Sequence, residues 1–164
     1  AMVVSILPGH QSPFFFAIGI FSGYLALSGN RAIRFKKKVK NFKTDRWISG
    51  IMAVSGALMI ITPPIITGSI NTILTVFGGT GLFFAIRDLL LFRNPSKLRK
   101  QWQQLHLGKM SGAYIAAVTA FVVVNETLPG LYAWFVPGLV GSVYIAYWTR
   151  KVSRPLMRKS LPLK

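Results

Sequence analysis

Five stretches of the chain are almost entirely apolar, and the polar residues are concentrated between them. A membrane-spanning helix needs roughly 20 mostly apolar residues, and these stretches reach or approach that length. No charged residue lies between Ile48 and Ile86, so helices there would have no solvated face. The pattern predicts an all-α, polytopic transmembrane bundle of about five helices, placed near residues 13–33, 47–62, 70–92, 107–125 and 131–148.

Strongly basic connections alternate with connections free of Lys and Arg along the chain. Of the 20 Lys and Arg residues, eight lie at 31–46, six at 87–109 and six at 150–164. The connections at 62–72 and 125–137 contain none. Because cytoplasmic loops of membrane proteins are enriched in Lys and Arg, we expect the start of the chain outside and its C-terminus in the cytoplasm. Residues 1–164 then form a single transmembrane domain, in which 149–164 is a basic cytoplasmic tail.

The composition favours a membrane protein over a nucleic-acid-binding one. A formal net charge of +17 would by itself point to nucleic acid. Only 14% of the residues are charged, however, whereas soluble domains have about a quarter. Too few polar groups remain to cover a water-soluble domain that could present the cations. We therefore expect no nucleic-acid partner, and we expect the cations to meet anionic lipids at the cytoplasmic face of the bilayer.

Small residues spaced by four mark candidate helix-packing faces. Helices in lipid associate through close packing, which small side chains permit. The longest such row is on the fourth helix, which is therefore expected to be central, with a small-residue face of the first or the fifth helix against it. The candidates are Gly108, Gly112, Ala116 and Ala120 on the fourth helix, Gly19 and Gly23 on the first, and Gly138, Ser142 and Ala146 on the fifth.

Acidic residues are scarce, and two of them are expected to have structural roles. Asp45 lies in the first basic segment and is expected to pair with Arg46 or Lys43. Arg87 and Asp88 lie inside an apolar run, where a charge usually faces a partner or a cavity. Adjacent residues point about 100° apart on a helix, so these two are not expected to pair. Asp88 is expected to anchor another helix or to reach the cytoplasmic surface.

Two histidines are the candidate ligands for a haem, quinone or pigment. His10 precedes the first helix on the outer side, and His106 opens the fourth helix on the inner side. They would lie roughly 30 Å apart, so they cannot ligate one group together. His106 could act as a single ligand, contact a quinone, or cap and pack the helix start. With two His, three acids and no Cys, we predict no metal site and no catalytic residue.

Four strings are more specific than generic membrane sequence: YLALSGNRA at 24–32, RDL at 87–89, HLGKMSGAYIAAVTAFVVVN at 106–125 and IAYW at 145–148. Over nearly the whole chain they resemble a family of uncharacterised bacterial polytopic membrane proteins, a domain of unknown function common in the Bacteroidetes. The resemblance implies the bacterial inner membrane but no activity. That family has a further N-terminal helix pair with additional histidines. The resemblance therefore implies that this chain is a C-terminal part, with residues 1–7 as the end of a preceding helix.

Three functions remain open from the sequence. The scarcity of ionisable groups in the apolar stretches favours a non-catalytic accessory or scaffold subunit of a larger membrane complex, with other membrane subunits as partners. The histidines allow a redox protein that holds haem, quinone or pigment with the help of histidines from other helices. A small transporter is the third, because transporters often contain discontinuous helices, and residues 78–81 or Pro137 could interrupt the third or the fifth helix.

Overall fold

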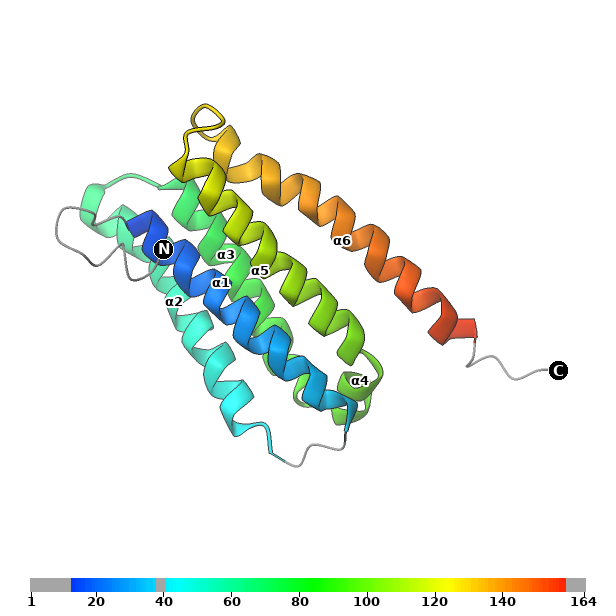
Figure 1. Cartoon of the computed structure of the whole chain (residues 1–164). Coiled ribbons are helices and arrows are strands. Elements are labelled where there is room, and N and C mark those ends of the chain that lie inside the picture. Colours follow the sequence, from blue (N-terminus) through cyan, green and yellow to red (C-terminus); the bar gives the residue numbers. More distant parts are fainter. Residues whose placement is uncertain (1–12, 38–40, 159–164) are drawn as a thin grey trace.

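The computed structural model describes residues 13–37 and 41–158 of the chain, and only the backbone of 152–158. These residues form an up-and-down arrangement of long helices without a strand among them (Figure 1). The long helices are α1 (Pro13–Ala32), α2 (Lys43–Thr67), α3 (Thr72–Leu91), α5 (Trp102–Val124) and α6 (Tyr132–Arg158). Two short ones lie between them, the 3₁₀-helix η2 (Ile33–Lys36) and α4 (Pro95–Lys100).

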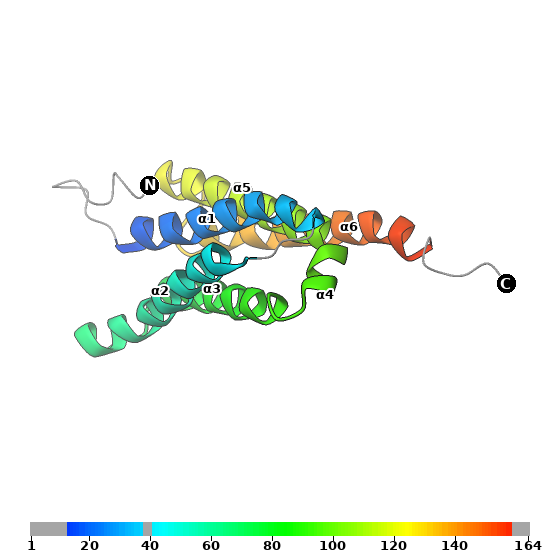
Figure 2. The same ribbon diagram turned by 90° about the horizontal axis from the view of Figure 1, so that it is seen from below.

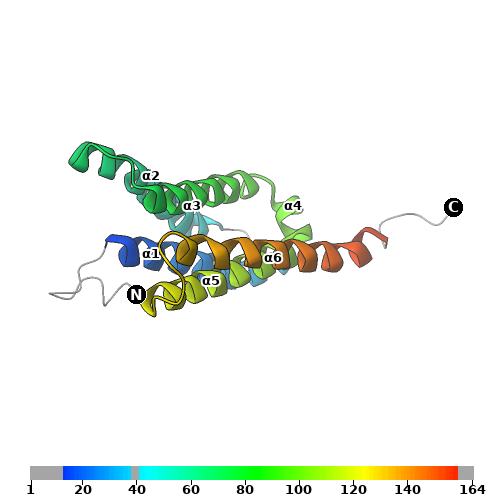
Figure 3. The same cartoon turned by 90° about the horizontal axis from the view of Figure 1, so that it is seen from above.

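The long helices form two layers. Viewed along the layers, α2 and α3 lie on one side and α1, α5 and α6 on the other (Figures 2 and 3). The closest pairings are α2 with α3, α1 with α5, and α5 with α6, while α1 also contacts α2 and α3. The layers are therefore joined chiefly through α1.

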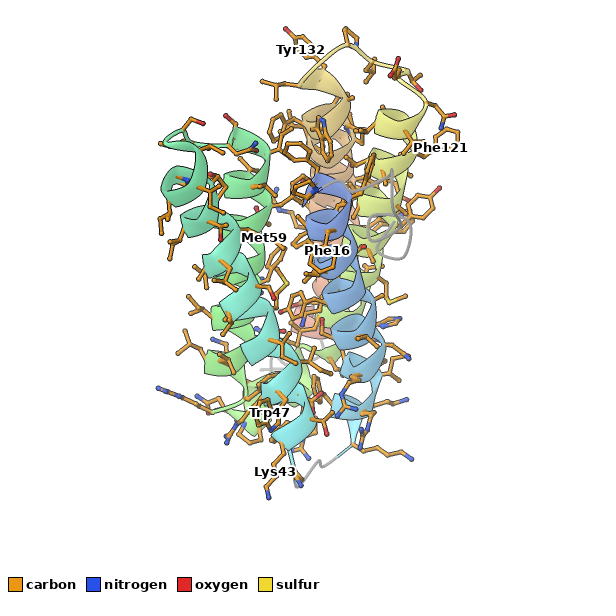
Figure 4. All side chains as sticks on the ribbon, turned by 90° about the vertical axis from the view of Figure 1, so that its left-hand side faces the viewer. Phe16, Lys43, Trp47, Met59, Phe121 and Tyr132 are labelled. Carbon is orange, nitrogen blue, oxygen red and sulfur yellow. The ribbon has the colours of Figure 1, made fainter. Side chains whose placement is uncertain are left out.

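The basic segments gather at one end of the bundle. Lys43 and Trp47 lie at this end, whereas Phe121 and Tyr132 lie near the other (Figure 4). The turns after α2 and α5, at 68–71 and 125–131, contain no Lys or Arg. We call the two ends the basic end (33–37, 41–46, 87–102 and 148–151) and the non-basic end (68–71 and 125–131). The alternation in the sequence thus corresponds to two chemically distinct ends of one bundle.

Four helices are long and apolar enough to cross a membrane: Pro13–Lys36, Lys43–Thr67, Thr72–Leu91 and Trp102–Val124. The all-helical fold and a multi-pass membrane character are thereby supported. Helix α6 is a continuous helix but lies outside this set of four. It is less apolar, because Tyr, Trp, Gly and Ser recur along it. A fifth span remains a prediction.

Helix boundaries differ from the expected ones at α2, α5 and α6. Helix α2 begins at Lys43 rather than at 47, and α5 begins at Trp102 rather than at 107. The prediction that Pro63-Pro64 ends the second helix is wrong, since α2 continues to Thr67. Each proline has a φ that a helix allows, although it removes one N–H donor and crowds the carbonyl four residues earlier. The two prolines therefore weaken α2 without ending it. The helix ends at Gly68, which has φ +66° and donates its N–H to the Pro64 carbonyl at 3.1 Å. At the other end of the chain, α6 extends to Arg158, into the predicted tail.

Helix α1, rather than α5, is the central helix. It contributes nine buried residues, whereas α5 contributes three. The expectation that the fourth long helix is central is therefore wrong. Helix α5 packs closely on two long helices, α1 and α6, whereas α1 contacts three, α2, α3 and α5. The main core combines residues of α1, α2, α3 and α5: Ile18, Phe21, Tyr24, Leu25, Met52, Ala85 and Ala116.

Glycines bring α2 and α3 into backbone contact. A Cβ atom on Gly56 would lie 2.7 Å from the carbonyl oxygen of Gly78, and a Cβ on Gly78 would lie 2.7 Å from that of Gly56. Gly81 on α3 faces the side chain of Met52 on α2. Helix α3 runs through residues 78–81 without a break, so these glycines permit close packing and do not interrupt the helix.

Trp134 closes the bundle near the non-basic end. Its ring lies 5.9 Å from that of Phe14 on α1 and 6.2 Å from that of Phe77 on α3. Phe77 in turn meets Phe21 edge-on at 5.6 Å. Such aromatic pairs add to the free energy of burial. Helix α6 is thus attached to both layers at its first turns, and Pro137 does not break it.

Candidate functional site

Asp88 is the centre of a buried polar cluster within the apolar bundle. It lies in the last turn of α3 and is 3% exposed. The Tyr24 hydroxyl on α1 donates a 2.7 Å hydrogen bond to Asp88 Oδ2, and the Lys109 ammonium on α5 forms an ion pair with the same oxygen. Lys109 Nζ also lies 5.3 Å from the centre of the Tyr24 ring. Three helices therefore meet at one carboxylate.

A second ion pair joins α1 to α2 closer to the basic end. Arg31 donates from Nε to Asp45 Oδ1 at 2.6 Å and from Nη2 to Oδ2 at 3.0 Å. Asp45 is 6% exposed. The expectation that Asp45 pairs with Arg46 or Lys43 is wrong. Asp45 points inward from the first turn of α2, toward α1, while those two neighbours are exposed.

His106 contacts the end of α1. Its Nδ1 lies 2.8 Å from the Gly29 carbonyl oxygen. A carbonyl can only accept, so Nδ1 carries the proton in this arrangement and Nε2 is left as the acceptor of the neutral ring. Because α5 begins at Trp102, His106 lies in its second turn and does not cap the helix start as one hypothesis held. His10 lies outside the described residues.

A small cavity separates the two ion pairs. It measures about 10 Å³, room for about one water molecule, and its polar lining is Ser28, Asp45 and Lys109. The Ser49 hydroxyl is also buried, and it has no hydrogen-bond partner within the described part of the chain. This polar region is too small for a cofactor or an organic substrate.

The polar region does not continue toward the non-basic end. Between Asp88 and that end the core includes Ile18, Phe21 and Met52, all under 8% exposed. The buried hydroxyl of Thr119 donates from Oγ1 to the Ile115 carbonyl of its own helix at 2.9 Å. The described residues thus provide no chain of polar groups from one end of the bundle to the other.

The predicted small-residue faces divide between packed and open positions. A Cβ on Gly112 would lie 3.2 Å from Leu25 Cδ1, so this part of the α5 row faces α1. Gly19 is buried, but neither Gly23 nor Gly108 has an atom within 4 Å of an added Cβ. Ala116 belongs to the main core, and Ala120 packs against it from a half-buried position. On α6, Gly141 faces Ile115, and a Cβ on Gly138 would meet nothing within 4 Å.

The two residues predicted as intramembrane polar groups have different environments. Asp88 is buried and paired, whereas Arg87 is exposed beside it. Tyr24, Lys109 and Arg31 were not identified as partners from the sequence. Lys109 could have been noticed, because it lies within the fourth apolar stretch, seven residues after Trp102. Within residues 13–37 and 41–158, no group of three His, Cys, Asp or Glu side chains could hold a metal ion.

Comparison of the chain with protein-family models, with curated proteins and with solved structures finds no match.

Proposed function

We propose that the chain is an integral membrane protein that acts as a non-catalytic accessory or scaffold subunit of a larger membrane complex. In this proposal the basic end faces the cytoplasm, the start of the chain and the non-basic end face outward, and α6 is the fifth span. The location we propose is the bacterial inner membrane, which follows from the family resemblance described above.

The pairing of the buried charges supports this proposal most directly. Asp88 and Asp45 each have a cationic partner from another helix, and both pairs join helices to one another. A buried charge that is paired and hydrogen-bonded in this way fixes the arrangement of its helices. Such groups are already engaged in holding the bundle together, which suits a scaffold better than a catalyst.

The exposed surface of the bundle suits lipid and partner helices. Helix α2 exposes an aliphatic row at helical spacing, formed by Ile51, Val54, Leu58, Ile61 and Ile65. Water would disfavour a surface of this kind, whereas lipid tails or another apolar helix would cover it. Among the described residues beyond its first turns, helix α6 packs chiefly on α5, and it exposes large apolar side chains, among them Leu139 and Val143.

Isolation of the native assembly tests the proposal. The protein should be extracted with a mild detergent from the membranes of cells that express it at natural levels. The size of the extracted assembly should then be compared with the size of the purified chain. We expect a larger assembly with a reproducible, stoichiometric membrane partner. A monodisperse species of the size of one chain, with no companion subunit, would contradict the scaffold role.

A redox role is the second candidate, and His106 favours it. A ligating histidine commonly donates its other ring N–H to a carbonyl, which directs the free nitrogen to the ligand. His106 makes this kind of contact with Gly29. The absorption spectrum and the quinone content of the purified protein test this role, with a His106→Ala variant as the comparison. A colourless protein without extractable quinone would eliminate it.

A transporter has less support. The expected breaks at residues 78–81 and Pro137 do not occur, since α3 and α6 are continuous. The core between Asp88 and the non-basic end also has no continuous row of polar groups among the described residues. Stabilisation of the protein by a specific small solute in thermal unfolding would favour this function again.

A further inference from the structure

Two short helices at the basic end each insert one apolar side chain into the bundle. Helix η2 inserts Phe35 and helix α4 inserts Leu98 into the same apolar cluster, where they are 6% and 2% exposed. The two elements also contact each other. Phe35 and Leu98 therefore attach the two short helices to the bundle.

The exposed residues on and beside these two elements are mostly basic. We call this surface the cationic platform, and its members are Arg34, Lys36, Lys37, Arg93, Lys97, Arg99 and Lys100. Lys36 Nζ lies 5.7 Å from the centre of the Trp102 ring. Trp rings and Lys side chains are typical of the headgroup level of a membrane protein.

No carboxylate balances the cationic platform within the described part of the chain. Asp45 and Asp88 are buried and already paired with Arg31 and Lys109. Glu126, the remaining acid, lies at the non-basic end. Like charges on one surface repel one another, so a bound counter-charge lowers the free energy of the protein. An anionic partner would therefore complement this surface.

We propose that the cationic platform binds the phosphate groups of anionic phospholipids at the membrane surface. The inference rests on the membrane-embedded placement in the proposed function. The platform lies where α1, α3 and α5 meet the basic end. Trp47 lies at that end (Figure 4), and Trp102 lies beside Lys36 of the platform. Phospholipid headgroups are the anions that surround a bundle at this level, and Lys and Arg near such a surface attract them.

Binding of a short-chain lipid to the full chain in detergent tests the inference. The probes are dioctanoyl phosphatidylglycerol and, as the neutral reference, dioctanoyl phosphatidylcholine. The platform variant combines Lys37→Gln, Lys97→Gln, Arg99→Gln and Lys100→Gln. The matched control removes the same charge from other exposed positions of the basic end, with Lys43→Gln, Arg46→Gln, Arg150→Gln and Lys151→Gln.

We expect the unmodified protein to prefer phosphatidylglycerol. The platform variant should lose at least about tenfold in affinity for it, and the control less than about threefold. Equal losses in both variants would mean diffuse attraction and would overturn the inference. So would equal affinity for both lipids, or a stronger, platform-dependent affinity for a single-stranded oligonucleotide.

Two further measurements separate the possible failures. If the platform variant does not fold, the salt dependence of the unmodified protein decides. Its preference for phosphatidylglycerol should disappear at high salt, because salt screens the interactions of exposed charges. A preference that persists at high salt overturns the inference. A chain that stays soluble without detergent would contradict the proposed function itself. A chain that needs detergent but shows no lipid preference would contradict only the lipid-binding inference.

Discussion

Gly56 and Gly78 face each other across α2 and α3 with their backbones in contact. A methyl group on either residue would lie 2.7 Å from the carbonyl oxygen of the other, closer than real Cβ atoms come. The interface therefore has no room for a side chain at either position. Close packing of this kind is the main attraction between helices in lipid, where the hydrophobic effect does not drive association.

Gly78→Ala should destabilise the protein, because α2 and α3 must move apart to admit the methyl group. We expect a loss of about 1–3 kcal/mol in the free energy of unfolding, measured by unfolding in detergent. Gly79→Ala is the matched control, since a Cβ there meets nothing within 4 Å. The control should be neutral or gain up to about 1 kcal/mol from helix propensity. Equal effects at both positions would mean that the contact is not formed.

Lys109→Met should be strongly destabilising, because it leaves the buried Asp88 carboxylate without its cation. Loss of one partner of a buried ion pair costs about 3–5 kcal/mol. The double variant Asp88→Asn with Lys109→Met should recover a large part of this loss, since no unpaired charge remains. The free energies of unfolding of both single variants and the double variant give the coupling. Additive effects would show that the two residues do not interact.

Gly112→Leu should lower the yield of folded protein, because the new side chain would push against Leu25 on α1. An added Cβ already lies 3.2 Å from Leu25 Cδ1. Gly108→Leu is one turn away on the same helix and has open space around it. We expect the yield and the melting temperature in detergent to fall for the first variant and to stay nearly unchanged for the second. The reverse order would place α1 elsewhere on α5.

Single cysteines can establish the orientation, because the chain has none of its own. Ser69→Cys places a thiol in the turn after α2, and Ser96→Cys places one in α4 at the basic end. In intact cells, a membrane-impermeant maleimide should label the first and not the second until the membrane is opened. Labelling of both from the outside would contradict the expected topology.

The long helices could be predicted from the sequence because apolar length is a local property. The first and third helices begin and end within two residues of the expected positions. The α2 terminus was missed, because Pro63-Pro64 permits one more turn before Gly68 ends the helix. Helix α4 was missed as well, since six residues with one buried Leu98 form no periodic pattern.

The polar cluster could be predicted only in part. The position of Asp88 in an apolar run showed that it needs a partner, but Tyr24 and Lys109 become its partners only through the crossing of α1, α3 and α5. The same holds for Asp45, whose partner Arg31 is 14 residues away rather than on the same turn. Spacing along one helix cannot identify contacts of this kind.

The position of Asp88 in the chain has a consequence for how the bundle is assembled during synthesis. Tyr24 has already left the ribosome when α3 emerges, whereas Lys109 follows Asp88 by 21 residues. A nascent chain that has inserted α1 to α3 can shelter the carboxylate with the tyrosine hydroxyl alone. When α5 packs against α1, Lys109 neutralises the Asp88 carboxylate. Completion of the bundle therefore depends on the insertion of the fourth long helix.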